Sequence, residues 1–267
     1  MELTRANYHS TEMNRKYMSC TQFKSFLPRF RGCEAKAMAK LTGEYLEQDN
    51  DAVLLGNYVH AWNSGELQEF MMDNPSLFKK NGTLYTKYAI GDLMIETLRN
   101  DPLIAKVREG QKEVIMTGEL FGMPWKIMID IYNPKLKVFT DLKTCREIHR
   151  TYWNEYLGER QNFIEFWGYD WQMAIYAEIE RQNRGGENYF SPHIIAVSKE
   201  EPHDKEVIYF GTDFIEQTLK EMEYYAERVN EVWEGRSKPE RCGVCDYCRE
   251  TKVLSGTVFY KDVGKVG

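Results

Sequence analysis

Apolar residues recur at helical spacing through the amino-terminal part of the chain, before strand patterns begin near residue 112. Ser19-Cys20-Thr21-Gln22 has the arrangement of a capping box, in which a serine and a glutamine satisfy backbone groups of the first helical turn. The helices that this pattern predicts cover residues 19–28, 33–46, 51–72 and 86–99.

Short runs of apolar residues, separated by turn residues, follow from residue 112 onward. The first three predicted strands are Glu113–Leu120, Trp125–Tyr132 and Val138–Leu142. Because their connections are short and contain Gly, Pro and Asn, they predict an antiparallel meander. The elements predicted after them are a helix over Phe163–Gln182, strands over His193–Val197 and Glu206–Phe210, and a helix over Thr212–Trp233.

This order of elements predicts an α/β fold with a mixed sheet flanked by helices. No internal repeat or low-complexity tract interrupts the pattern. We therefore expect one domain over residues 1–240 with a helical amino-terminal region. A short cysteine-containing appendix would follow over residues 241–267.

Two apolar runs, residues 126–129 and 137–140, are followed directly by acidic residues, Asp130 and Asp141, which are thereby expected at strand ends. Since alternate residues of a strand share one face, Asp141 and Lys143 point the same way, whereas Leu142 turns into the core. Charged groups are rare in apolar strands unless they are paired or hold a metal. An ion pair between Asp141 and Lys143 is the plainer interpretation, but it leaves Asp130 unexplained.

These residues suit the hydrolysis of a phosphodiester by a magnesium-dependent enzyme. A hard divalent cation activates water and neutralises phosphate charge, and it prefers oxygen ligands. The carboxylates of Asp130 and Asp141 and the backbone carbonyl of Leu142 would supply such ligands to Mg²⁺ or Mn²⁺. Lys143 would orient or deprotonate the attacking water and stabilise the developing charge.

With further segments in the same order, the chain resembles the PD-(D/E)XK nuclease superfamily, in its RecB/RecE-like exonuclease branch. An isolated Asp-x-Lys is common by chance, whereas five segments in the order of the family are more specific. The resemblance spans roughly residues 19–200, and the segments that carry it are Gly56-Asn57-Tyr58-Val59-His60, Glu113, Asp130, Asp141-Leu142-Lys143-Thr144 and Gln172-Met173-Ala174-Ile175-Tyr176.

The resemblance implies roles at the site for four more residues. His60 would lie beside the metals or the phosphate, and Glu113 would reach the metal through water or bind a second ion. Gln172 and Tyr176 share one helical face, which the resemblance places over the active site, with Gln172 contacting the DNA backbone or the lysine. The plainer alternatives are a structural histidine, a solvated glutamate, and a glutamine beside a core tyrosine.

The formal net charge of −6 counts against a protein that coats nucleic acid nonspecifically, although it allows a local DNA contact. The stretch Glu12–Lys40 is rich in lysine and arginine, with Phe23, Phe26 and Phe30 interleaved. Such a mixture suits contact with a strand end, but the helical spacing of the phenylalanines favours a place in the core.

No apolar stretch approaches the length of a membrane span and no leader precedes the chain, so we expect a cytoplasmic protein.

In a reducing compartment the six cysteines are thiols or metal ligands. Cys242, Cys245 and Cys248 are spaced so that their thiolates can converge on one metal, and Cys33 or Cys20 would be the fourth ligand. Some RecB-like nucleases pair three carboxy-terminal cysteines with one before the nuclease core and hold an iron–sulfur cluster, which is what the resemblance implies here. The third cysteine follows here after a shorter gap than is usual, so zinc and free thiols remain alternatives.

The resemblance implies a DNA exonuclease that acts from duplex ends in phage or prophage recombination, in the manner of RecE. Its partners would be DNA, a single-strand annealing protein and further copies of itself. One alternative is an iron–sulfur nuclease of CRISPR adaptation or repair, and another is a catalytically idle DNA-binding module. Retention of Asp130, Asp141, Lys143 and His60 argues against the idle module. Polarity and strand preference are left open.

Overall fold

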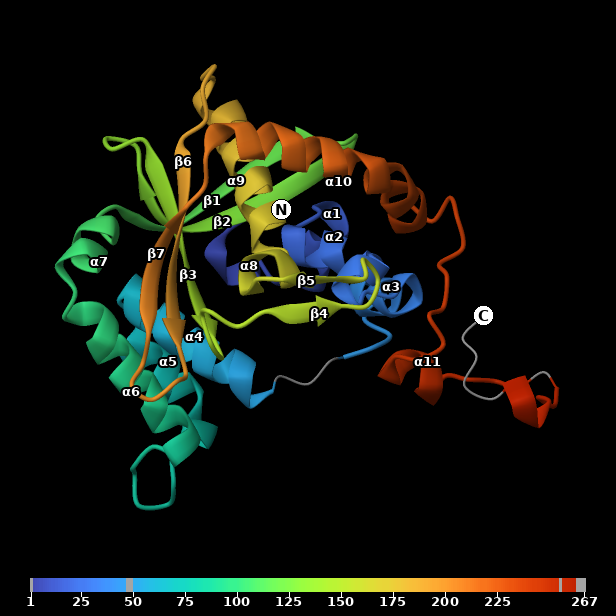
Figure 1. Ribbon diagram of the computed structural model, residues 1–267, viewed down its shortest axis with the longest axis horizontal. Coiled ribbons are helices and arrows are strands. Elements are labelled where there is room, and N and C mark those ends of the chain that lie inside the picture. The colour runs from blue at the N-terminus through green and yellow to red at the C-terminus, as the bar shows by residue number, and fades with distance from the viewer. Residues whose placement is uncertain (1, 47–49, 255, 263–267) are drawn as a thin grey trace.

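The computed structural model of the protein describes residues 2–46, 50–254 and 256–262, so part of the predicted appendix, residue 255 and residues 263–267, lies outside the described residues. A mixed sheet with the order β1-β2-β3-β6-β7 forms its centre (Figure 1). The strands are β1 (Gln111–Leu120), β2 (Met123–Asn133), β3 (Val138–Cys145), β6 (Ser191–Ser198) and β7 (Lys205–Tyr209). Of these five strands, only β3 and β6 pair in parallel, which confirms the predicted antiparallel meander and the mixed sheet.

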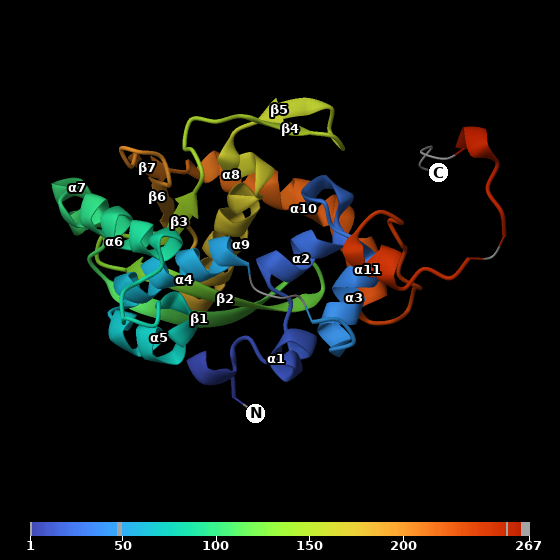
Figure 2. The ribbon, with the colours of Figure 1, turned by 90° about the horizontal axis from the view of Figure 1, so that it is seen from below.

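Helices cover both faces of this sheet (Figures 1 and 2). The amino-terminal helices are α1 (Thr11–Lys16), α2 (Cys20–Phe26), α3 (Glu34–Thr42), α4 (Asp51–Ser64), α5 (Leu67–Asp73), α6 (Thr86–Arg99) and α7 (Pro102–Val107). The later helices are α8 (Phe163–Phe166), α9 (Tyr169–Arg184), α10 (Thr212–Trp233) and α11 (Asp246–Glu250). A separate hairpin of β4 (Tyr152–Asn154) and β5 (Glu159–Gln161) precedes α8.

Alternate residues of the central strands enter two different cores. Trp125 and Phe139 pack with α9 and α10 on one face, whereas Leu142 packs on the other face with residues of α4 and α6. Burial of one such apolar side chain contributes about 1.5–3 kcal/mol. The sheet is therefore held rigidly between two helical layers, and the ends of its central strands are fixed in position.

The hydrogen-bonded ladder between β2 and β3 is short. It pairs Ile131 with Thr140 and continues toward Asn133 and Val138, so the next pair in the other direction would be Asp130 with Asp141. The two strands separate at that point. Met18 takes the vacated edge of β2, because its amide donates to Pro124 O at 2.8 Å and its carbonyl accepts from Lys126 N at 2.9 Å.

Several predicted boundaries were wrong. The predicted helix over Phe163–Gln182 is divided into α8 and α9 at Gly168, which has a left-handed φ of 63°. A Cβ atom there would lie 2.6 Å from the Lys24 side chain, so only glycine fits. The capping box is also incomplete: Ser19 accepts from Gln22 N, but the Gln22 side chain donates to Asn14 O.

The predicted helix over residues 51–72 is likewise two helices, broken at Gly65, and the helix predicted to reach residue 46 ends at Thr42. Helices α6 and α10 begin and end where the pattern placed them. Among the described residues, no helix is both long enough and apolar enough to span a membrane.

The basic and aromatic stretch near the amino terminus mainly stabilises the fold. Phe23 and Phe26 are buried in the core, as their helical spacing predicted. Arg29 is buried and pairs with Glu221, and Lys24 donates to the carbonyls of Trp167 and Gly168. These contacts favour a structural interpretation for both basic residues.

Candidate active site

A cleft of about 1140 Å³ lies on the central strands where β2 and β3 separate. Residues before α1, together with residues of α2, α4 and α5, line its walls, and β1, β2, β3 and α9 contribute the residues beneath. Seven residues predicted for the site line this cleft: His60, Glu113, Asp130, Asp141, Lys143, Gln172 and Tyr176. Leu142 instead lies buried in the core behind it.

Three acidic residues lie in one row across the first three strands. Asp130 and Asp141 would form the next pair of the β2–β3 ladder. Glu113 lies between Lys112 and Val114, whose partners on β2 are Ile131 and Ile129, so it lies opposite Asp130. The left-handed φ of 52° at Glu113 interrupts the β1–β2 ladder at this row. The strand register therefore places the three acidic residues at the same level of neighbouring strands.

Asp130 is held by groups from two neighbouring elements. Its Oδ2 accepts from Leu142 N at 2.8 Å, a bond that the separation of the strands makes available, and lies 3.3 Å from His60 Nδ1 on α4. Burial raises the pKa of Asp130, the Asp141 carboxylate adds to the rise, and the value reaches about 6. Gly56, one turn before His60, faces Thr144, and a Cβ there would lie in ordinary contact with Thr144 Oγ1 at 3.4 Å.

Asp141 is buried and contacts two residues of the site. Its Oδ1 accepts from Gln172 Nε2 at 2.7 Å, and its Oδ2 lies 2.6 Å from Lys143 Nζ. Burial lowers the pKa of Lys143, but Asp141, Tyr169 and Asp130 together outweigh this effect and hold the pKa above its ordinary value. The ammonium also lies 4.7 Å from the centre of the Tyr169 ring. Lys143 is therefore a fixed positive charge at the site.

The donor set suits a hard divalent cation. Two buried carboxylates lie side by side, and burial together with the Asp141 charge raises the pKa of Asp130. Among the described residues, Asp141 Oδ2 accepts no hydrogen bond of ordinary geometry besides its ion pair with Lys143. A cation with oxygen ligands would satisfy this oxygen and relieve the repulsion.

Glu113 and Tyr176 have further partners. Glu113 pairs with Arg5, which also pairs with Glu66 at 2.5 Å, so an arginine from the amino-terminal segment joins two acids across one side of the cleft. Tyr176 is buried, and its ring lies 6.5 Å from that of Phe139. Tyr176 therefore presents only a small part of its surface to the cleft.

The sequence pattern did not single out Lys126, which also lines the cleft. It lies four residues before Asp130 on the same face of β2 and is almost completely buried. Its ammonium donates to Tyr8 O and, at 2.7 Å, to Asn14 Oδ1, and burial lowers its pKa to about 8. A lysine within an otherwise apolar strand was the signal, since buried lysines are rare without partners.

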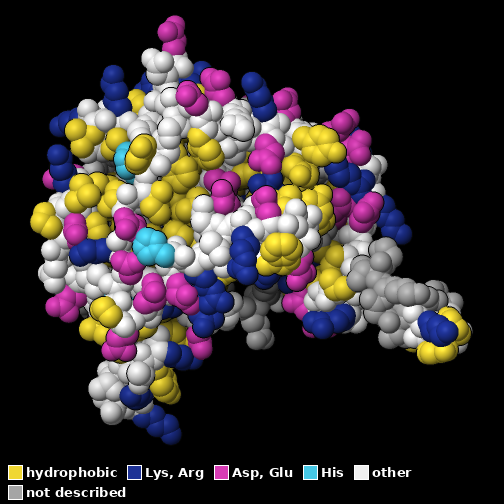
Figure 3. Space-filling view, viewed as in Figure 1, with side chains coloured by type: hydrophobic (Ala, Val, Ile, Leu, Met, Phe, Trp, Pro, Cys, Tyr) yellow, Lys and Arg dark blue, Asp and Glu magenta, His cyan; other side chains and the backbone are white. Residues whose placement is uncertain are grey.

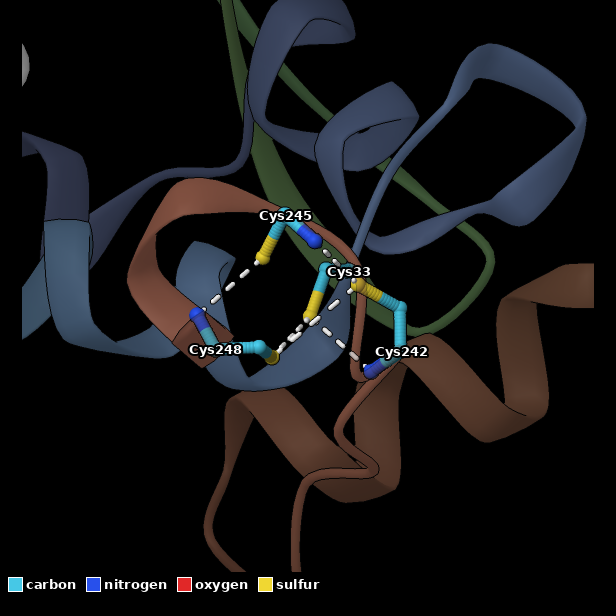
Figure 4. Close-up of side chains that lie close together, drawn as sticks. All are labelled: Cys33, Cys242, Cys245 and Cys248. Atoms are coloured by element: carbon cyan, nitrogen blue, oxygen red, sulfur yellow. Dashed lines mark hydrogen bonds between the residues drawn. The ribbon is translucent and has the colours of Figure 1, made fainter. Parts of the chain in front are cut away.

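Four cysteines meet away from this cleft (Figure 4). Cys33 precedes α3, and Cys242, Cys245 and Cys248 surround the start of α11; their Sγ atoms all lie within 4.8 Å of one another. Backbone amides donate to the sulfurs, for example Cys245 N to Cys242 Sγ at 3.3 Å. Burial alone would raise the pKa of Cys242, but these bonds bring it to about 7. Cys33, and not Cys20, completes the group.

The chain is similar to proteins of known family and structure. The profile of the family described as "PDDEXK-like domain of unknown function (DUF3799)" matches residues 19–251. The crystal structure of a "putative exonuclease" from Eubacterium rectale is 35% identical, with a TM-score of 0.93 over 99% of each chain. The structure of SSO0001 is 14% identical over 80% of this chain and 91% of that one, and its TM-score of 0.30 is too low to bear on the fold. No curated protein matches.

Proposed function

Since the chain belongs to the PDDEXK-like family, we propose that it is a metal-dependent nuclease that hydrolyses DNA phosphodiesters at the cleft between β2 and β3. The observation that carries the proposal is the row formed by Glu113, Asp130 and Asp141, with Lys143 paired to the last of them. These groups have the charges that phosphodiester hydrolysis requires, and they meet in a cleft.

The residues of the site have different expected roles in hydrolysis. Asp130 and Asp141, with the carbonyl of Leu142, would hold Mg²⁺ or Mn²⁺, which when bound supplies charge neutralisation at the phosphate and a reactive water. Lys143 stays protonated because its pKa is raised, so it suits orientation of a water and stabilisation of negative charge better than proton removal. His60 lies beside Asp130 and could contact either the metal or the phosphate.

We further propose that the enzyme acts from DNA ends. Arg5, paired with Glu66 and Glu113, closes one side of the cleft, and this arrangement suits the end of a strand better than an uninterrupted duplex. A role in phage or prophage recombination, with a single-strand annealing protein and in a homo-oligomer, rests on the resemblance to RecE alone.

For the cysteine site, we propose one zinc ion. Tetrahedral zinc with Zn–S bonds of about 2.3 Å places the sulfurs about 3.8 Å apart. The distances here are 3.6 Å for Cys33–Cys248 and 3.9 Å for Cys242–Cys248. An iron–sulfur cluster spreads its thiolates over several irons, so some sulfur pairs must be farther apart. The geometry thus supports zinc over the iron–sulfur cluster that the resemblance implied.

This site would join the appendix to the rest of the chain. Residues 241–250 contact α3 through the cysteines and through Lys36, which lies 2.8 Å from an Asp246 oxygen. We propose that residues 1–240 form the nuclease domain and that the appendix stabilises this domain through its contacts with α3. Metal analysis of protein purified without oxygen tests the zinc: one zinc per chain and no colour are expected. Brown protein with iron and acid-labile sulfide would contradict it.

The nuclease proposal is tested with one plasmid in two forms. Linearised and supercoiled plasmid are incubated side by side with Mg²⁺, with the Lys143→Met variant as the control. We expect the linear form to be degraded and the closed circle to survive. The control should be slower by roughly a hundredfold, as for removal of one charge-stabilising group. Rapid nicking of the supercoiled form would make the protein an endonuclease, and hydrolysis of neither form would refute the nuclease.

A further inference from the structure

The β4–β5 hairpin and the turn after α8 expose large aromatic side chains. Trp153 is 53% exposed, Tyr156 54% and Trp167 46%; we refer to these three residues as the aromatic platform. In Figure 3, hydrophobic and basic side chains adjoin on the face that carries the hairpin. Trp153 and Tyr156 belong to the same hairpin, and Trp167 contacts Tyr152 at its base, so the three residues lie on neighbouring segments.

The hairpin is anchored firmly to the body of the protein. On its inner face Asn154 is buried, and its side chain donates to Arg29 O at 3.2 Å and to Gln161 Oε1 at 2.9 Å. Tyr152 stacks on Phe166 with ring centres 4.8 Å apart. Because side chains alternate along a strand, Trp153 must point outward. It pairs across the hairpin with Arg160, so an indole and a guanidinium lie together on the outer face.

The platform is linked to the active site through the turn after α8. Trp167 is followed by Gly168 and Tyr169, and the Tyr169 ring lies 4.7 Å from Lys143 Nζ. On the other side, Trp167 lies 6.3 Å from Tyr152 of the hairpin, ring centre to ring centre. Lys24 of α2 fixes the turn through its bonds to the Trp167 and Gly168 carbonyls, at 2.6 and 3.2 Å. Trp167 therefore lies close in the chain to the residue that contacts the site lysine.

We propose that unpaired bases of the DNA strand entering the cleft stack on the aromatic platform, an inference that rests on the proposed nuclease function. Every base has a π-face, so stacking on tryptophan tolerates any sequence. Acidic residues lie among the basic ones in the segments that carry the platform, so this surface suits bases better than a row of phosphates. The basic residues are Lys24, Arg31, Arg146, Arg150 and Arg160, and the acidic ones are Glu147, Glu155, Glu159 and Glu165.

Binding of a fluorescent oligothymidylate tests the platform in the full-length protein. Anisotropy is measured with Ca²⁺ in place of Mg²⁺, for the parent and for Trp153→Ala, Trp167→Ala and Trp153→Phe. Each alanine variant should bind about fivefold to a hundredfold more weakly, since stacking of one base contributes roughly 1–3 kcal/mol. Trp153→Phe should keep most of the affinity. The loss should be nearly equal at low and moderate salt, because few counterions are involved.

Tyr224→Ala is the matched control, since Tyr224 is 83% exposed on α10 and lies outside the platform. Affinity equal to that of the parent in both tryptophan variants, or an equal loss in Tyr224→Ala, would overturn the platform. Hydrolysis of bis(p-nitrophenyl) phosphate separates this result from failure of the nuclease proposal. That small ester needs no base contact, so the tryptophan variants should hydrolyse it as the parent does. A parent that hydrolyses neither ester nor DNA would refute the nuclease proposal and, with it, the inference.

Discussion

Gln172 Nε2 donates to Asp141 Oδ1 at 2.7 Å, and this bond leaves the second carboxylate oxygen beside Lys143. The resemblance placed this glutamine near the DNA backbone or the lysine. In the structure its amide orients the aspartate, because α9 packs across β1, β2 and β6 and brings Gln172 to Asp141. Gln172 therefore controls which way one of the expected metal ligands faces.

Gln172→Ala should lower both metal affinity and hydrolysis rate by roughly tenfold to a hundredfold, the usual effect of losing a residue that orients a ligand. Calorimetry with Mn²⁺ and a rate assay on linear duplex would measure the two effects. Gln182→Ala is the control, because Gln182 lies on the same helix but bonds to Glu119 and Glu178 instead. Unchanged metal affinity in Gln172→Ala would mean that the bond to Asp141 does not matter for binding.

Asp130→Asn and Asp141→Asn should each reduce hydrolysis by roughly a hundredfold or more, but they should differ in stability. The pKa of Asp130 is raised, so its ionisation costs stability as pH rises from about 4 through 6, and Asp130→Asn should be at least as stable as the parent at pH 7.5. Asp141→Asn leaves Lys143 without its partner and should unfold at a lower temperature. Thermal unfolding in a chelating buffer would show the order. If Asp130→Asn unfolded at a lower temperature than the parent, burial and the Asp141 charge would not destabilise ionised Asp130 as we infer.

Cys245→Ala should lose the metal and free residues 241–250 for proteolysis. Cys242 Sγ accepts from the Cys245 amide, and Cys245 Sγ accepts from the Cys248 amide. These bonds stabilise the thiolates and hold the backbone of this segment in its fold. Limited proteolysis followed by mass spectrometry would locate the cuts. Cys145→Ala is the control, since Cys145 is buried at the end of β3 and should leave the metal content unchanged. Protection equal to that of the parent in Cys245→Ala would show that no metal holds this segment.

Asp170→Asn should stabilise the protein at pH 8 but not at pH 5. Burial raises the pKa of Asp170 to about 7, and its Oδ1 has no hydrogen-bond partner among the described residues. The folded state thus binds the proton more tightly than the unfolded state. The contribution that this proton makes to stability is fully present below about pH 4 and is lost as pH rises through 7. The unfolding midpoint at pH 8 should rise by roughly 2–4 °C per kcal/mol recovered.

The matched control for this prediction is Glu227→Gln, which removes an exposed acid on α10. Its midpoint should follow that of the parent at both pH values. If Asp170→Asn gave the same gain at pH 5 as at pH 8, the effect would come from packing and not from ionisation.

The sequence predicted those parts of the site that depend on local pattern. Asp130 and Asp141 could be assigned to two neighbouring strands because alternation and turn residues define where β2 and β3 run. Their predicted place at strand ends was wrong, since both lie within their strands. The break at Gly168 was missed because the hydrophobic period continues across it, and the features that favour glycine there, the left-handed φ and the close approach of Lys24 and Phe30, appear only in the folded structure. Lys126 was missed for a similar reason, since its acceptor Tyr8 O lies 118 positions away in the sequence.

The amino-terminal segment has a consequence for where this domain can be cut. The family match begins at residue 19, yet both groups that receive the Lys126 ammonium, Tyr8 O and Asn14 Oδ1, come before it. A protein shortened to the matched residues would keep every expected metal ligand. It would also lose both of these acceptors of the Lys126 ammonium, and we expect that loss to lower the stability of the shortened protein. The smallest working unit is therefore longer than the family match, because residues outside it satisfy a charge inside it.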